Sequence, residues 1–269
     1  MPKPSTFAFG ANWNRFLRHV TEDRVRSAER SLTEFMDLEN LRNRSFLDVG
    51  CGSGLFSYAA FRLGATRVVS FDPDPLSVEC CAHLRRAAGS PANWEVHQAS
   101  ILDSDFTSRL GSFDIVYAWG TLQHTGQMWE ALRRSTELVK NGGYLYIAIY
   151  NQVEGLLGSK FWRGFKKGFN ALPRPAQFIV ELVTIPVYFA ARGLHSRSLI
   201  GNVQKYESSR GMYWRTDLTD WLGGLPYECA TVEEVFKFVR NQCGKLDLHN
   251  LKTTNSLANN WYLFQRVDR

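Results

Sequence analysis

Apolar and polar positions repeat with two periods along the chain, one typical of strands and one of helices. Residues 21–38 place Val25, Ala28, Leu32 and Phe35 at helical spacing behind acids in the first turn, which predicts an amphipathic helix. Short apolar runs then alternate with further helical segments. The predicted strands are "SFLDV", "RVVSFD", "WEVHQA", "FDIVYAW" and "GGYLYIAIY". The predicted helices between them are "GLFSYAAFRLG", Pro75 to about Ala88, and Gln127 to Leu138.

Strands that alternate with helices indicate an α/β fold, a doubly wound parallel sheet with helices on both faces. The alternation stops after Tyr150 and returns with a helix near 231–242. Two further strands, "KLDLHNLKT" and "NWYLFQRV", follow it, and their short connection suits an antiparallel pair at the sheet edge. The intervening residues 152–226 are therefore a predicted insertion.

The positive charge belongs to this insertion rather than to the whole chain. Residues 151–215 contain ten Lys or Arg against three Asp or Glu, whereas the 269-residue chain has a net charge of +6. The five cysteines form no C-x-x-C pair and no metal-ligand spacing, which predicts reduced thiols, a cytoplasmic protein and no metal site. The first 13 residues lack the apolar core of a signal peptide.

One short stretch combines an acid with three glycines where a strand gives way to a helix. In "LDVGCGSG" these are Asp48, Gly50, Gly52 and Gly54. Ligands of doubly wound sheets bind beyond the carboxyl ends of the strands, and glycines let the backbone approach a ligand closely. The spacing differs from the G-x-G-x-x-G of dinucleotide-binding folds, which argues against an oxidoreductase.

The ends of the next two strands carry complementary chemistry. Asp72 ends the second strand, where a carboxylate can accept hydrogen bonds from both hydroxyls of a ribose. Ser100 and Ile101 follow the third strand and could edge an adenine ring. The order of acid, glycines, ribose acid and adenine edge predicts an adenosine-containing ligand.

These segments together resemble the motif set of the class I S-adenosylmethionine-dependent methyltransferases. The matching stretches are "LDVGCGSG", "VVSFDPDPLSV", "VHQASILD", "FDIVYAWGTLQHTGQMWEAL" and "LVKNGGYLYIAIYN". The resemblance covers residues 45–151 well and 228–267 loosely. It implies a Rossmann-like, seven-stranded sheet with an antiparallel last strand, S-adenosylmethionine as methyl donor and S-adenosylhomocysteine as product.

The resemblance also implies roles for individual residues. Asp48 would orient the methionine end of the donor, the three glycines would line its methionine and ribose, and Asp72 would bind the ribose. The predicted donor-binding residues are Trp13, Asp48, Gly50, Cys51, Gly52, Ser53, Gly54, Asp72, Pro73, Ser100, Ile101 and Trp119. For Trp119, a position in the core is the alternative.

His124 is the predicted catalytic base, because it titrates near neutrality and follows the fourth strand, which faces the methyl group in this fold. Small-molecule methyltransferases of quinone biosynthesis resemble this segment, with "LHH" where this chain has "LQH". The alternative is that His124 caps the next helix or lines the donor pocket. The predicted acceptor contacts are Gln123, Tyr150, Asn151, Arg210, Tyr213 and Trp214, with strand termination or packing as their alternative.

The chain divides into four predicted parts: an N-terminal lid and helix (1–44), the donor-binding core (45–151), the insertion covering the acceptor (152–226) and the end of the sheet (227–269). The lid could instead pack on the core. For the insertion three interpretations remain: a cap packed on the domain or on a second subunit of a homodimer, peripheral membrane contact through 160–194, or an electropositive site for an acidic metabolite or RNA.

We therefore predict a methyltransferase that acts on oxygen or nitrogen of a small molecule such as a metabolite, natural product, quinone or lipid. The segment after the fourth strand lacks the "DPPY"-like or "NPPY"-like sequence of enzymes that methylate DNA bases, which argues against nucleic acid as partner. RNA or protein methylation, and a donor-binding scaffold without catalysis, are the alternatives.

Overall fold

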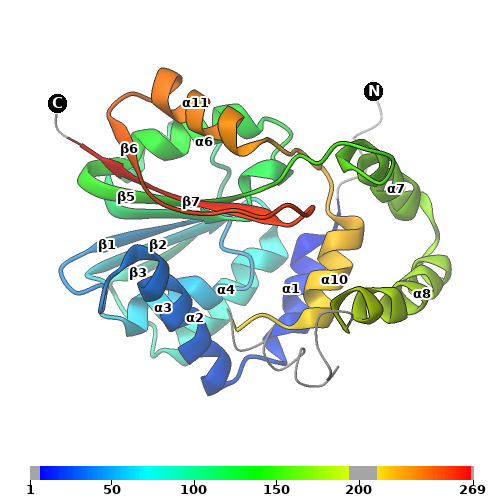
Figure 1. The fold of residues 1–269 in the computed structure, drawn as a ribbon. Coiled ribbons are helices and arrows are strands. Elements are labelled where there is room, and N and C mark those ends of the chain that lie inside the picture. Colours follow the sequence, from blue (N-terminus) through cyan, green and yellow to red (C-terminus); the bar gives the residue numbers. More distant parts are fainter. Residues whose placement is uncertain (1–6, 194–210, 268–269) are drawn as a thin grey trace.

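A seven-stranded sheet with the order β3-β2-β1-β4-β5-β7-β6 forms the centre of the computed structural model, which describes residues 7–193 and 211–267 (Figure 1). The strands are β1 (Ser45–Val49), β2 (Arg67–Asp72), β3 (Trp94–Gln98), β4 (Phe113–Trp119), β5 (Val139–Tyr150), β6 (Leu246–Lys252) and β7 (Asn259–Arg266). β1 pairs in parallel with β2 and β4, β2 with β3, and β4 with β5. β7 is antiparallel to both β5 and β6. The predicted doubly wound sheet with an antiparallel last strand is confirmed.

Helices cover both faces of the sheet. They are α1 (Phe9–Leu17), α2 (Glu22–Met36), α3 (Leu55–Arg62), α4 (Pro75–Ala87), α5 (Ser104–Leu110), α6 (Met128–Glu137), α7 (Ser159–Ala171), α8 (Arg174–Gly193), α10 (Trp214–Gly223) and α11 (Val232–Gln242). None of these described helices is long and apolar enough to cross a membrane.

Strand side chains point alternately to the two faces, and this divides the core. Leu47 and Val49 of β1 pack in the cluster that α5, α6 and α11 close. Phe46, their neighbour, packs in the cluster of α1, α2, α3 and α4. Both faces of β1 are buried along its whole length, as expected for a central parallel strand.

Helices α1, α7, α8 and α10 gather beyond the carboxyl ends of the parallel strands (Figure 1). Two side chains of α7 fasten it to the end of α10: the Lys166 ammonium donates to the Trp221 carbonyl, and the Asn170 amide donates to the Gly223 carbonyl at 2.7 Å. The predicted insertion 152–226 thus contributes three described helices, α7, α8 and α10, of which α7 and α10 are joined by these bonds. Residues 194–210 of it lie outside the described part.

Helix α11 begins with a reciprocal capping arrangement. The Thr231 hydroxyl accepts a hydrogen bond from the Glu234 backbone N–H at 3.2 Å, and the Glu234 carboxylate accepts one from the Thr231 N–H at 2.8 Å. This satisfies two N–H groups that have no partner inside the helix.

Replacing Thr231→Ala should lower the free energy of unfolding by about 1 kcal/mol, because the N-cap oxygen is lost. Urea denaturation followed by circular dichroism measures this. Glu233→Gln, in the same exposed first turn but outside the capping pair, is the control and should change stability by a few tenths of that amount at most. Equal effects of the two variants would contradict the cap.

Candidate donor and acceptor site

The glycine turn between β1 and α3 is closed in from two sides. A Cβ on Gly50 would lie 2.1 Å from the Thr121 methyl carbon, and one on Gly52 would lie 2.9 Å from the Trp13 indole nitrogen. Both glycines also have positive φ angles, of 69° and 53°, which residues with side chains rarely adopt. Both positions therefore require glycine, because a side chain would clash with Thr121 or Trp13.

Asp72, at the end of β2, is tied to this turn. Its carboxylate accepts hydrogen bonds from the Gly52 N–H at 3.1 Å and from the Asp74 N–H at 2.9 Å. Burial raises the pKa of Asp72 to about 6, and the two backbone bonds oppose the rise. The ribose acid expected from the sequence thus lies directly beside the glycines.

Asp48 is buried underneath the turn. Its carboxylate accepts a bond from the Ser57 hydroxyl at 2.5 Å, and a chain of bonds continues through Ser70 to the Trp94 indole N–H. Burial raises the pKa of Asp48 to about 7. The side chain holds β1, α3 and β3 together, and the methionine role implied by the resemblance stays a prediction.

Helix α1 covers the turn. The N–H of Gly10 donates to the Asp74 carboxylate at 2.9 Å, and Trp13 lies against Gly52. The sequence predicts an aromatic lid here but no helix. In the structure this segment is helical, and the buried Asn12 fastens it to α10 by donating to the Thr216 carbonyl at 2.9 Å. Its role as a lid stays a prediction.

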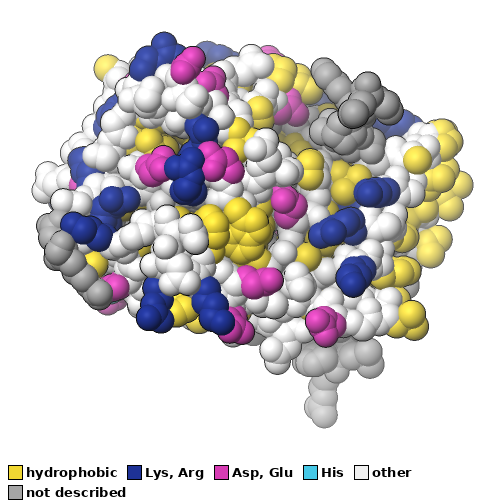
Figure 2. Space-filling model, turned by 90° about the horizontal axis from the view of Figure 1, so that it is seen from above, with side chains coloured by type: hydrophobic (Ala, Val, Ile, Leu, Met, Phe, Trp, Pro, Cys, Tyr) yellow, Lys and Arg dark blue, Asp and Glu magenta, His cyan; other side chains and the backbone are white. Residues whose placement is uncertain are grey.

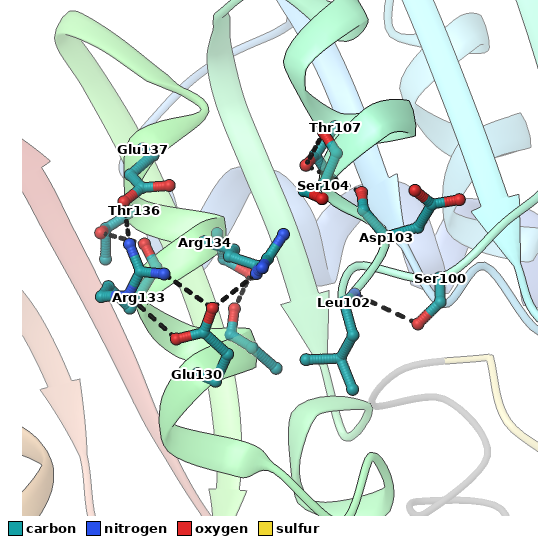
Figure 3. A network of polar contacts seen from close by, with 12 residues as sticks. Ser100, Leu102, Asp103, Ser104, Thr107, Glu130, Arg133, Arg134, Thr136 and Glu137 are labelled. Atoms are coloured by element: carbon teal, nitrogen blue, oxygen red, sulfur yellow. Dashed lines mark hydrogen bonds and ion pairs between the residues drawn. The ribbon is translucent and has the colours of Figure 1, made fainter.

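The third strand leads into a loop that is organised by its own side chains (Figure 3). The Ser100 hydroxyl accepts from the Leu102 N–H at 3.1 Å, and Asp103 caps α5 by accepting from the Asp105 and Phe106 N–H groups. Ile101 is buried. Among the other predicted donor residues, Cys51 and Ser53 are buried in the turn, and Pro73 is exposed.

His124 lies behind the lid, in the short 3-10 helix after β4 (Leu122–His124). Its Nδ1 lies 2.7 Å from the Pro226 carbonyl oxygen, which can only accept, so Nδ1 carries the proton and Nε2 the lone pair. The rings of Phe9 and Tyr150 pack against the imidazole. Burial lowers its pKa to about 3, so the ring is neutral at physiological pH.

The sequence analysis missed one residue near this histidine, a buried lysine. Lys166 of α7 is fully buried, and its ammonium lies 4.9 to 6.0 Å from the ring centres of Tyr227, Trp221 and Tyr150. Burial lowers its pKa to about 8. In sequence Lys166 stands beside Lys167, and only the helical phase of Phe165 and Phe169 distinguishes the inward lysine from the outward one.

Asp220 of α10 completes this group. Burial raises its pKa to about 7, Asp217 raises it further, and Lys166 lowers it. Its Oδ1 is buried and has no hydrogen-bond partner among the described residues. Lys166 and the Asp220 carboxylate thus lie among the rings of Tyr150, Trp221 and Tyr227, a group of residues that we call the aromatic chamber and that His124 borders through Tyr150. A buried cation and a buried acid in such surroundings are suited to binding a polar group.

The remaining predicted acceptor residues are placed differently. The Asn151 amide donates to the Thr254 and Ser256 carbonyls and so holds the β6–β7 connection. Gln123 is buried and donates to the Asn259 side chain at 3.2 Å. Tyr150 alone of this set lines the aromatic chamber.

Tyr213 and Trp214 stand at the start of α10, whereas Gly224, just after its end, lies beside His124. The Tyr213 ring stacks on His19 at 4.1 Å. Trp119, a predicted donor residue, packs edge-to-face on Trp261. Arg210 lies outside the described residues.

Replacing Gly50→Ala should weaken binding of S-adenosylhomocysteine at least tenfold, about 1.4 kcal/mol, because the new methyl group would displace Thr121. Isothermal titration calorimetry measures the affinity, and a thermal melt reports whether the variant folds. Gly111→Ala is the matched control, since Gly111 has a similar φ of 71° but nothing within 4 Å of the added carbon. Equal loss of affinity in both variants would contradict the assignment.

Comparison with known proteins agrees with this geometry. Residues 47–147 match the family model of the methyltransferase domain. A tRNA U34 carboxymethyltransferase of Saccharophagus degradans is 27% identical over 188 residues, which cover 69% of this chain and 56% of that protein. One of the same name from a Shewanella species is 36% identical over 107 residues, covering 40% of this chain and 31% of that protein. The chain thus spans little more than half of the first relative's length.

Solved structures share the fold at low sequence identity. An O-methyltransferase family protein from Burkholderia thailandensis has a TM-score of 0.56 at 14% identity, covering 91% of this chain and 57% of that chain. Magnesium protoporphyrin IX methyltransferase from Synechocystis, with bound S-adenosylhomocysteine, has a TM-score of 0.53 at 11% identity, covering 95% and 93%.

The names of the curated relatives do not support the sequence argument against nucleic acid, and the acceptor is therefore treated below as a proposal. The family match, the sheet order and the glycine turn beside Asp72 agree on one conclusion. Residues 47–147 of this chain form a methyltransferase domain, and the sheet that contains them has the class I methyltransferase fold.

Proposed function

We propose that this protein transfers a methyl group from S-adenosylmethionine to an oxygen or nitrogen atom of a small-molecule acceptor. The observation that carries the proposal is the position of α1. Through Trp13 this helix contacts the donor turn, through Gly10 it contacts Asp74 next to the ribose acid, and through Phe9 it contacts His124. One short helix thus separates donor and acceptor groups from solvent at the same time.

The donor would lie on the glycine turn, with Asp72 accepting from the ribose hydroxyls and Trp13 covering it. When bound, S-adenosylmethionine supplies a methyl group already activated by its sulfonium, so the protein contributes mainly alignment. Holding two reactants in line can contribute on the order of 7–11 kcal/mol to a lowered barrier. Exclusion of water by α1 protects that alignment.

The acceptor would enter the aromatic chamber of Tyr150, Trp221 and Tyr227. Lys166 can donate a hydrogen bond to an acceptor oxygen, and Asp220 can accept one from a hydroxyl or amino group. Two groups could take the acceptor's proton. His124 offers the lone pair of Nε2 but is a weak base in this burial, whereas Asp220 titrates close to neutrality.

A small acceptor fits the chamber better than a macromolecule does, because the polar groups that would meet it are buried. The second candidate acceptor is tRNA, which the names of the curated relatives favour. In that case a single base would have to leave its stack to reach the chamber. The basic insertion would then contact phosphates.

Label transfer from methyl-tritiated S-adenosylmethionine into a bacterial extract separates these candidates. We expect label in solvent-soluble lipids or in polar small molecules, above the blank set by the Asp72→Ala variant. This variant should bind the donor at least tenfold more weakly. Label confined to RNA would replace the small-molecule acceptor by tRNA or another RNA. No label in any fraction, with S-adenosylhomocysteine still bound, would refute catalysis.

The pH dependence of transfer identifies the base. If Asp220 takes the proton, the rate should rise as pH increases through about 7, where its carboxyl ionises, and Asp220→Asn should abolish that rise. If His124 takes the proton instead, the rate should not change through pH 7, because the imidazole is already neutral there. In that case His124→Ala should lower the rate at least tenfold without changing affinity for S-adenosylhomocysteine, since removing a general base typically costs about 10²–10⁴-fold.

Replacement of the exposed His97→Ala is the control for the histidine variant. Full activity of His124→Ala would remove His124 from the chemistry. A rise through pH 7 that persists in Asp220→Asn would remove Asp220 as the base.

A further inference from the structure

Large apolar side chains are exposed chiefly on one part of this molecule. Of the ten that the described residues expose, eight lie between residues 156 and 183. Figure 2 shows hydrophobic side chains gathered at the end of the molecule that α7 and α8 form, with Lys and Arg side chains beside them. Six of the residues form what we call the α7–α8 face: Leu157, Phe161, Phe178, Ile179, Leu182 and Val183.

Helix α8 has two apolar faces, only one of which is packed. Val180 and Ile185 lie against the cluster of Phe169, Leu218 and Leu222 on α7 and α10. On the other side Ile179 is 60% exposed and Val183 is 65% exposed. A contiguous exposed apolar patch marks an interaction site, so the outer face needs an occupant.

The charges around this face indicate which occupant it is. Lys160, Lys167 and Arg174 are exposed on the same two helices. Residues 152–185 contain five Lys or Arg and only two acids, Glu154 and Glu181. Lys160 and Lys167 are seven residues apart and so share one side of α7, which is opposite the buried Phe169 and next to the side that carries Phe161. Apolar side chains flanked by basic ones are typical of helices that lie in a membrane interface.

A second copy of this chain is the competing occupant. In a symmetric dimer the same surface meets itself, so Lys160 and Lys167 of the two copies would approach each other around a dry contact. Anionic lipid headgroups instead neutralise these lysines while the apolar side chains enter the acyl boundary. The charge pattern thus favours lipid over self-association.

We propose that the α7–α8 face docks this protein on an anionic lipid surface. The proposal is independent of the acceptor, but it has a consequence for access. The inward side of α7 carries Lys166 into the aromatic chamber, so the membrane-facing helix and the acceptor-binding helix are the same one.

Vesicle flotation tests the proposal on the full chain, using vesicles of phosphatidylcholine alone and of an equimolar mixture with phosphatidylglycerol. We expect binding to the mixed vesicles that falls with added salt and is weaker on phosphatidylcholine alone. The double variant Ile179→Ser with Val183→Ser should reduce the partition coefficient about tenfold or more. Leu251→Ser, an exposed apolar residue on β6, is the control and should bind as the unchanged protein does.

The charge contribution is tested by Lys160→Glu with Lys167→Glu, which should remove the preference for anionic vesicles. Arg240→Glu, exposed on α11, should not.

Absence of binding to either vesicle would overturn the proposal. Self-association that the serine variant abolishes, without vesicle binding, would overturn it in favour of a second copy. RNA binding that only the glutamate variant weakens, again without vesicle binding, would overturn it in favour of nucleic acid. Binding of S-adenosylhomocysteine, measured in parallel, reports on the donor site separately.

Discussion

The bond between the Gly52 backbone N–H and the Asp72 carboxylate fixes the relation on which the rest of this site depends. It joins the turn after β1 to the end of β2, the two edges between which a nucleoside can lie. Because the same carboxylate also accepts from Asp74, the start of α4 is set by it. Asp74 in turn holds Gly10 of α1. A single chain of contacts therefore runs from the turn to the lid.

Three acids are buried around the positions predicted for the donor and the acceptor. Asp48, Asp72 and Asp220 all have pKa values raised by burial, to about 7, 6 and 7. An acid whose pKa is higher in the folded state than in the unfolded state stabilises the fold most below its unfolded value, and this contribution is lost as pH rises through the folded value. The site is thus built at the expense of stability near neutral pH, a trade common at functional sites.

The sequence predicts the sheet well because strand and glycine signals are local. β2 and β4 have the predicted bounds, and the glycine turn and Asp72 come together because adjacent parallel strands end at one edge. Helices α1 and α10 were not predicted, since Gly10 and the Gly223–Gly224 pair weaken a helical pattern that tertiary contacts then enforce. The approach of Lys166 to Asp220 depends on how two helices of the insertion pack, and neither residue has a local signature that would reveal it.

The contacts of α1 set an order for events at the site. This helix covers the donor turn through Trp13 and also supplies Phe9 to the wall around His124. Under the proposed function α1 must move aside to admit the donor, and the wall around His124 is complete again only after the helix has returned. A shared wall of this kind imposes an ordered sequence. The donor binds before the acceptor, and the methylated acceptor leaves before the demethylated donor. The rate at which α1, a helix of nine residues, moves away from the site would then limit turnover.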